Sequence, residues 1–234
     1  MTVNYKGLDS LSNVAIVSDF DGTITDIDTN DLIYFTFGGQ PSYEIEKLIA
    51  QGKLGVKEGA LQHFKRIHLT EQEFLSFIFQ NARLDEGFKD FCKLLSEKGI
   101  PLIVVSGGYV NTISSFFEKE GIDSTNIKIY ANRLKFNGCH IEAVFFDESD
   151  ECESGLGPCG NCKLRRLREF KAQYQTIIFI GDGTTDRCAA READIVFAKG
   201  RLRDYCAAQG VPYVPFDSFH DIIHFLQYFL TICK

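Results

Sequence analysis

Four short apolar runs alternate with amphipathic segments along most of the chain. Each run is continuous, and the residues that follow it carry apolar side chains at helical spacing. Continuous runs of this length indicate strands that are buried on both faces, as in a parallel sheet covered by helices. The repeated strand–helix units therefore predict an α/β fold with a doubly wound parallel sheet. The predicted strands are 14–18, 100–105, 176–180 and 195–197.

Residues 27–86 lack a strand pattern. Two apolar stripes at helical spacing lie within 45–67, and Thr70-x-x-Glu73 forms a capping box before a third stripe. This pattern predicts a small all-helical cap that is inserted after the first strand. We therefore expect an α/β core made of residues 1–26 and 87–234, with residues 27–86 as the cap.

Two more elements are predicted in the second half of the chain. The segments 127–134 and 139–146 flank Asn137-Gly138, which is a strong signal for a β-hairpin. Apolar residues recur at helical spacing within 216–232. This last segment is expected to form a helix that packs on the sheet.

Composition and charge limit the classes of protein to consider. The chain has 234 residues, 44% of them hydrophobic, so a packed core is expected. A formal net charge of −7 argues against a nucleic-acid-binding protein, and the basic cluster 163–168 is interpreted as a solvated helix face. No apolar stretch reaches the ~20 residues that a membrane span needs, and no signal-peptide pattern is found. We expect a cytoplasmic protein, either a monomer or a homodimer.

Two carboxylates, Asp19 and Asp21, directly follow the first apolar run, where a buried strand should end. Strand alternation predicts that both side chains point to the same side. Like charges so close together repel, and their burial is costly unless a cation lies between them. Because Mg²⁺ takes oxygen ligands of this kind, the pair predicts a magnesium site with one carboxylate free for covalent chemistry.

Polar residues also follow two other predicted strands. Ser106-Gly107-Gly108 follows the second strand, and Asp182, with Asp186 four residues later, follows the third. The carboxyl ends of parallel strands meet at one edge of a sheet, so we expect these residues to join Asp19 in one site. Such a set suits phosphoryl transfer to a carboxylate, with a lysine such as Lys163 neutralising the charge of the transition state.

The strings DFDGTIT, VVSGG and GDGTTD, together with Lys163, resemble the ordered motif set of the haloacid dehalogenase-like phosphatases. The resemblance implies a Rossmann-like α/β core, and residues 27–86 resemble the cap of the phosphoserine-phosphatase-like branch. It also implies Mg²⁺-dependent hydrolysis of a small phosphate monoester through an aspartyl-phosphate. A non-catalytic protein that binds a phosphorylated ligand is the alternative.

The same resemblance implies roles for individual acidic residues. Asp19 would be the nucleophile and a metal ligand. Asp21 would be the general acid and base, with its backbone carbonyl on the metal. Asp182 would be the second carboxylate ligand, and Asp186 would orient the water shell of the metal or Lys163.

The resemblance implies that Ser106 and Lys163 hold the phosphoryl group, together with the backbone of Gly107 and Gly108. Cap residues are the expected contacts of the rest of the substrate. These expected contacts are Asp28, Asp31, Phe64 and Arg66.

Three strings resemble a methionine-salvage subfamily that acts on 2-hydroxy-3-keto-5-methylthiopentenyl-1-phosphate: 56–59, 81–88 and 159–163. Gly183-Thr184 departs from the Ser-Val pair that is typical of that subfamily. A phosphoserine phosphatase is the alternative. Ungapped matching of the cap helix, however, puts Phe64 where that enzyme has an arginine, and a phosphoserine carboxylate would then lack its charge partner.

Four cysteines in the irregular segment 127–162 leave three interpretations open. A structural zinc site, a disulfide and free thiols all fit their presence, and the spacing favours free thiols. These residues are Cys139, Cys152, Cys159 and Cys162. Three histidines show no partner spacing and are interpreted as surface or core residues. They are His63, His68 and His140.

Overall fold

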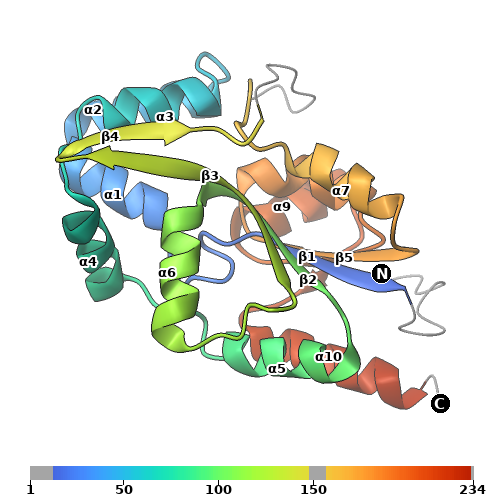
Figure 1. Ribbon diagram of the computed structural model, residues 1–234. Coiled ribbons are helices and arrows are strands. Elements are labelled where there is room, and N and C mark those ends of the chain that lie inside the picture. The colour runs from blue at the N-terminus through green and yellow to red at the C-terminus, as the bar shows by residue number, and fades with distance from the viewer. Residues whose placement is uncertain (1–12, 148–156, 233–234) are drawn as a thin grey trace.

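The computed structural model describes residues 13–147 and 157–232, the last four of them as backbone alone (Figure 1). Its central feature is a sheet of seven strands in the order β4-β3-β2-β1-β5-β6-β7. All neighbouring strands are parallel except β3 and β4. The strands are β1 (Val14–Ser18), β2 (Leu102–Tyr109), β3 (Ile127–Asn137), β4 (His140–Val144), β5 (Thr176–Gly181), β6 (Ile195–Ala198) and β7 (Val214–Pro215). The predicted α/β class is confirmed.

Helices cover both faces of this sheet. In β1, Ile16 packs into the apolar cluster on one face, and Ala15 and Val17 pack into the cluster on the other. This is why the strand reads as an unbroken apolar run. The first face carries α5 (Phe88–Lys98), α6 (Val110–Glu120) and α10 (Phe219–Ile232). The second carries α7 (Lys163–Lys171), α8 (Arg187–Glu192) and α9 (Gly200–Gln209).

The segment between β1 and α5 is helical, as its pattern predicts. It contains α1 (Thr29–Gly38), α2 (Gln40–Ala50), α3 (Val56–Phe64) and α4 (Glu71–Asn81). The capping box at Thr70 and Glu73 starts α4. These four helices (the cap helices) lie together on one side of the molecule, next to the ends of β3 and β4 (Figure 1). Their packing is continuous with the core, because the rings of Phe79 and Phe116 meet edge to face at 5.0 Å.

The predicted hairpin is present, with its turn displaced by one residue. Asn137 pairs with His140, so Gly138 and Cys139 form the loop, and Gly138 takes a φ of 59°. Cys139 therefore lies in the turn and not in a strand. In Figure 1 the hairpin extends away from the rest of the sheet towards the cap helices, and β4 packs against α3.

The C-terminal helix α10 packs on α5, where Phe219 meets Phe88 edge to face at 5.1 Å. The short edge strand β7 was not predicted, because two residues are too few to give a strand pattern. Across the described residues, no helix combines the length and the apolar character that crossing a membrane would require.

Candidate active site

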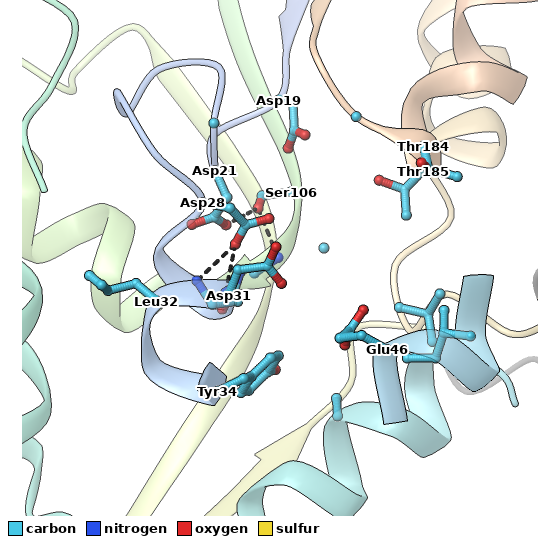
Figure 2. Close-up of a pocket in the computed structure, with 18 of the residues that line it drawn as sticks. Asp19, Asp21, Asp28, Asp31, Leu32, Tyr34, Glu46, Ser106, Thr184 and Thr185 are labelled. Atoms are coloured by element: carbon cyan, nitrogen blue, oxygen red, sulfur yellow. Dashed lines mark hydrogen bonds between the residues drawn. The ribbon is translucent and has the colours of Figure 1, made fainter. Parts of the chain in front are cut away.

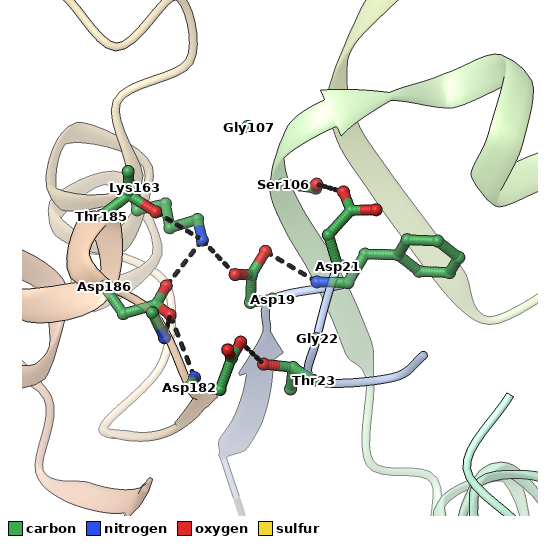
Figure 3. Close-up of polar contacts among 12 residues, drawn as sticks. Asp19, Asp21, Gly22, Thr23, Ser106, Gly107, Lys163, Asp182, Thr185 and Asp186 are labelled. Atoms are coloured by element: carbon green, nitrogen blue, oxygen red, sulfur yellow. Dashed lines mark hydrogen bonds and ion pairs between the residues drawn. The ribbon is translucent and has the colours of Figure 1, made fainter. Parts of the chain in front are cut away.

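The predicted site residues gather at the carboxyl ends of three adjacent strands (Figure 3). Asp19 follows β1, Ser106 lies near the end of β2, and Asp182 follows β5. Since β1 pairs in parallel with both β2 and β5, these three ends share one edge of the sheet. The expectation that the motifs converge there is met.

Lys163 joins two carboxylates at the centre of this group. Its Nζ lies 2.6 Å from Asp19 Oδ2 and 2.6 Å from Asp186 Oδ1, and it donates to Thr185 Oγ1 at 3.4 Å. The lysine is only 4% exposed. Burial acts to lower its pKa, but the carboxylates of Asp186 and Asp19 act more strongly, so the pKa of Lys163 lies above its usual range. The ammonium therefore stays charged.

Asp186 uses both of its oxygens within the protein. Oδ1 accepts the contact from Lys163, and Oδ2 accepts hydrogen bonds from the backbone N–H groups of Asp182 at 3.1 Å and Gly183 at 2.8 Å. These contacts fix the loop after β5 and the position of Lys163. Asp186 therefore orients Lys163 and the loop after β5.

A group of carboxylates suited to a cation lies at the same edge. Oxygens of Asp19, Asp182 and Asp186 all lie within 4.8 Å of one another. Burial, followed by the charge of Asp186, raises the pKa of Asp182 to about 6. Crowded, partly buried carboxylates of this kind fit a hard divalent cation such as Mg²⁺, which would offset their repulsion.

The loop after β1 leaves space for the Asp182 side chain and contacts it. Thr23 Oγ1 donates to Asp182 Oδ1 at 2.6 Å. Gly22 takes a φ of 74°, and a Cβ there would lie 2.7 Å from Asp182 Oδ2. A glycine is therefore required by both the backbone conformation and the close approach.

Asp21 lies on the same side of the chain as Asp19, as the alternation predicts, because both carboxylates face the site while Phe20 between them packs into the core (Figure 3). Strand β1 ends at Ser18, and Asp21 already lies in a turn. Asp21 Oδ1 accepts a short hydrogen bond from the Thr29 hydroxyl, and Oδ2 accepts one from Ser106 Oγ at 3.2 Å. Burial raises the pKa of Asp21, against these hydrogen bonds. A Cβ at Gly108 would overlap Asp21 Oδ2, so this glycine makes room for the carboxylate.

Two buried residues whose contacts the sequence patterns did not reveal hold the Ser106 side of the site. Asn161 Nδ2 donates to the backbone carbonyls of Ser106 at 2.9 Å and Tyr130 at 2.8 Å. Asp147 Oδ2 accepts from the N–H of Cys162 at 2.7 Å, at the start of α7. Together they fix the end of β2 relative to the helix that presents Lys163. Their roles depend on tertiary contacts, which local spacing does not reveal.

A cavity of about 990 Å³ opens from these residues towards the cap helices (Figure 2). Its wall includes Asp19, Asp21, Ser106, Lys163 and Asp182. Of the other expected substrate contacts, Gly107, Gly108, Asp28 and Asp31 also line it. The apolar part of the wall includes Ile49, Val56 and Phe145.

The cap side of this cavity is acidic. Asp28 caps α1 by accepting from the N–H groups of Asn30 and Asp31. Although part of the Asp28 side chain is open to the cavity, desolvation and the charges of Asp21 and Asp31 raise its pKa. Burial and then the charge of Glu46 raise the pKa of Asp31 to about 6.

Two expected substrate contacts do not reach the cavity. Phe64 is 2% exposed and packs edge to face against Tyr34 and Tyr109. Arg66 is exposed and donates to the backbone carbonyl of Gln62 at 2.7 Å. The expected contacts of Phe64 and Arg66 are therefore corrected: the first is a core residue and the second a surface residue.

The structure does not assemble a cysteine site from the described residues. Cys139, Cys159 and Cys162 belong to no group of three side chains that could hold a metal, since Asp19, Asp182 and Asp186 form the one such group in the described ranges. Cys152 lies outside those ranges. Cys139 is exposed at the hairpin turn.

Comparison with known proteins gives a consistent result. The family model described as "haloacid dehalogenase-like hydrolase" matches residues 16–191. A 2-hydroxy-3-keto-5-methylthiopentenyl-1-phosphate phosphatase of Lysinibacillus sphaericus is 34% identical, over 91% of this chain and 93% of that protein. A protein of the same name from Bacillus cereus strain G9842 is 32% identical, over 94% of this chain and 99% of that protein.

Solved structures of similar fold are phosphoserine phosphatases and related proteins. One, described as a phospho-aspartyl intermediate analogue of phosphoserine phosphatase, has a TM-score of 0.65 at 20% identity and covers 91% of this chain and 98% of that chain. A phosphoserine phosphohydrolase-like protein from Francisella tularensis has a TM-score of 0.64 at 21% identity and covers 90% of this chain and 98% of that chain. At these identities the likeness concerns the fold. The chain therefore belongs to the haloacid dehalogenase-like hydrolase family.

Proposed function

We propose that this chain is a Mg²⁺-dependent phosphatase that hydrolyses a small phosphate monoester through an aspartyl-phosphate on Asp19. The observation that carries the proposal is the buried contact of Lys163 with Asp19 and Asp186, next to Ser106 and Asp182 in one cavity. In this proposal residues 27–86 form the cap, and residues 1–26 and 87–234 form the core that carries the chemistry.

The first step is attack of an Asp19 carboxylate oxygen on phosphorus. Lys163 and the Ser106 hydroxyl bind phosphate oxygens, together with the backbone of Gly107 and Gly108. Asp21 gives its proton to the leaving oxygen of the ester. Its raised pKa supports this role, because a carboxyl group must be protonated to act as an acid.

The second step is attack of water on the phosphoryl group held by Asp19. Asp21, now ionised, takes a proton from the water, and the Asp19–phosphate bond breaks to release inorganic phosphate. Asp19, Asp182 and the Asp21 backbone carbonyl would hold Mg²⁺, with Asp186 orienting Lys163 and the loop. Bound Mg²⁺ would supply charge neutralisation for the two carboxylates and a phosphate oxygen.

The proposed substrate is 2-hydroxy-3-keto-5-methylthiopentenyl-1-phosphate, the compound in the names of the relatives above. Two features of the cavity support it over phosphoserine. The apolar wall of Ile49, Val56 and Phe145 suits a thioether tail. The arginine on the wall, Arg201, has a side chain that is 76% exposed and lies 4.0 Å from Asp31, so it is poorly placed to bind a phosphoserine carboxylate.

Steady-state kinetics test the proposal. We expect the purified protein to hydrolyse p-nitrophenyl phosphate with Mg²⁺ and to lose this activity in EDTA. Asp19→Asn should lower kcat by about 10⁴-fold or more, since it removes the nucleophile. Asp90→Asn, an exposed carboxylate of α5, is the matched control. Absence of turnover in the wild type would favour a non-catalytic binding protein.

The substrate is tested separately by comparing kcat/KM across a panel of phosphorylated metabolites. The panel includes 2-hydroxy-3-keto-5-methylthiopentenyl-1-phosphate and phosphoserine. We expect the first to have the higher kcat/KM. A clear preference for phosphoserine would contradict the substrate and leave the phosphatase chemistry intact.

A further inference from the structure

His63 is a buried polar residue of the cap with both ring nitrogens engaged. It is 0% exposed, Nδ1 lies 3.0 Å from Ser42 Oγ, and Nε2 lies 3.0 Å from Glu46 Oε1. Its ring stacks on Tyr34 with centroids 3.9 Å apart and planes 5° from parallel. His63 is thus a core residue, one of the two placements expected, and its partners on α1 and α2 are ones that sequence spacing did not reveal. Contacts on both nitrogens and one ring face hold the imidazole in a single orientation.

Two residues that His63 contacts, Glu46 and Tyr34, are wall residues of the cavity. Glu46, on α2, and Tyr34, on α1, both line it, and the Glu46 side chain is 33% exposed. His63 holds Oε1 of Glu46, and no described residue donates to Oε2. Figure 2 shows Glu46 facing the space into which Asp31 points from α1. The Glu46 carboxylate thus has a fixed position and acceptor capacity on the cavity side.

Tyr34, on which His63 stacks, also connects the cap to the end of β2, where the phosphate is proposed to bind. Tyr34 and Tyr109 share a hydrogen bond between their hydroxyls, 3.1 Å apart. Tyr109 ends β2, three residues after Ser106. Glu46 is therefore linked through His63 and Tyr34 to the end of β2, and it lines the same cavity as Ser106 and Lys163.

The charges of the wall restrict what can meet Glu46. Asp28, Asp31 and Glu46 all line the cap side of the cavity. Lys47 and Arg201 also line the cavity, but next to these three acceptors a hydrogen-bond donor on the leaving group is favoured over a carboxylate. Donors of this kind come from hydroxyl groups or from an ammonium group.

We propose that His63 positions Glu46 to accept a hydrogen bond from the leaving group of the ester, so that the cap selects phosphate esters whose leaving group carries donors. This inference rests on the proposed phosphatase function. It assigns Glu46 as a specificity-determining residue and His63 as a residue that acts through it.

The test compares phosphate esters whose leaving groups differ in their hydrogen-bond donors. Fructose 1-phosphate carries hydroxyl groups, phosphoethanolamine carries an ammonium group, and the leaving group of p-nitrophenyl phosphate carries no donor. In Glu46→Gln we expect kcat/KM for the donor-bearing ester to fall about 10- to 100-fold, chiefly through KM, with p-nitrophenyl phosphate changed less than about 3-fold. The ester that loses kcat/KM identifies the donor. Glu44→Gln, an exposed glutamate of α2, should change neither.

Variants of His63 separate positioning from a structural role. His63→Phe keeps a ring against Tyr34 but removes the contact with Glu46, so it should show the same selective loss. The double variant with Glu46→Gln should lose no more than the larger single loss, because both changes act on one contact. His63→Gln, which keeps a donor for Glu46, should recover most of the selectivity and serves if the Phe variant does not fold.

Several outcomes would overturn the inference. Equal effects of Glu46→Gln on all three esters would do so, as would additive losses in the double variant. Wild-type protein that hydrolyses p-nitrophenyl phosphate but neither donor-bearing ester also contradicts it. Failure of the wild type to hydrolyse any ester with Mg²⁺ is a different result, because it contradicts the proposed function itself.

Discussion

The Lys163 ammonium lies 2.6 Å from the Asp19 carboxylate, with both residues buried at the edge of the sheet. The lysine makes a second contact of the same length with Asp186. One cation thus sits between two carboxylates before any ligand binds. A phosphate dianion would enter a site whose positive charge is already fixed in place, which lowers the cost of reorganisation during reaction.

Removal of this cation should damage both stability and activity. Lys163→Met keeps the unbranched stem of the side chain but leaves Asp19 and Asp186 buried without their charged partner. We expect a loss of about 3–5 kcal/mol in the free energy of unfolding and a fall in kcat of about 10³-fold. Urea denaturation and p-nitrophenyl phosphate turnover measure the two effects.

A matched control lies on the same helix. Lys171 pairs with Asp194 at 3.1 Å on the surface, so Lys171→Met should cost about 1 kcal/mol or less and leave turnover unchanged. Equal loss of stability in the two variants would show that the buried pair contributes no more than a surface pair.

Magnesium binding should stabilise the folded protein through Asp182. The cation would relieve repulsion between Asp182 and Asp19, whose oxygens lie within 4.8 Å. At a Mg²⁺ concentration 100 times Kd we expect about 2.7 kcal/mol of added stability, measured as a rise in Tm that EDTA reverses. Asp182→Asn should lose most of this rise, while Asp90→Asn keeps it. A rise of the same size in Asp182→Asn would place the metal elsewhere.

The fold and the main chemical groups could be predicted because local patterns determine them. The apolar runs of β1, β2 and β5 are buried on both faces. Asp19, Ser106 and Asp182 could be identified as site residues because each lies at or near the carboxyl end of one of these strands. The helices between β1 and α5 follow from apolar spacing and from the capping box at Thr70.

Details that depend on side-chain direction could not be predicted. The Asp21 carboxylate accepts a hydrogen bond from the Thr29 hydroxyl of α1, and no spacing rule identifies that hydroxyl as its partner. The resemblance to the phosphoserine-phosphatase cap placed Phe64 near the substrate, but its ring packs against Tyr34 and Tyr109. The partners of Asn161 and His63 lie on other elements of the chain, so only the tertiary structure could reveal them.

Asn161 should affect turnover without contacting the substrate. Its amide joins the carbonyls of Ser106 and Tyr130, next to the start of the helix that carries Lys163. Asn161→Ala removes both hydrogen bonds, and we expect a loss of about 1–3 kcal/mol in stability and a fall in kcat of about 10-fold or more, with KM changed less. Asn137→Ala, at the exposed hairpin, is the control. A stability loss with unchanged kcat would limit Asn161 to a structural role.

Asp31 gives the protein a pH-dependent stability that one substitution should remove. Burial and then Glu46 raise its pKa from 3.8 to about 6, against the attraction of Arg201. The folded state therefore binds a proton more tightly than the unfolded state. The favourable contribution of protonated Asp31 is complete below about pH 4 and is lost as the pH rises through 6.

Asp31→Asn keeps a neutral side chain at every pH, so it should match the wild type near pH 4 and exceed its stability above pH 7. Because the Asp31 side chain is 32% exposed, solvent screens part of the effect, and we expect a gain of about 1–2 kcal/mol at pH 7.5. Unfolding free energies at pH 5, 6 and 7.5 measure it, with Asp90→Asn as the control. The gain should grow with each step in pH. A gain independent of pH, or a loss at pH 7.5, would mean that Asp31 ionises in the folded protein as easily as in the unfolded chain.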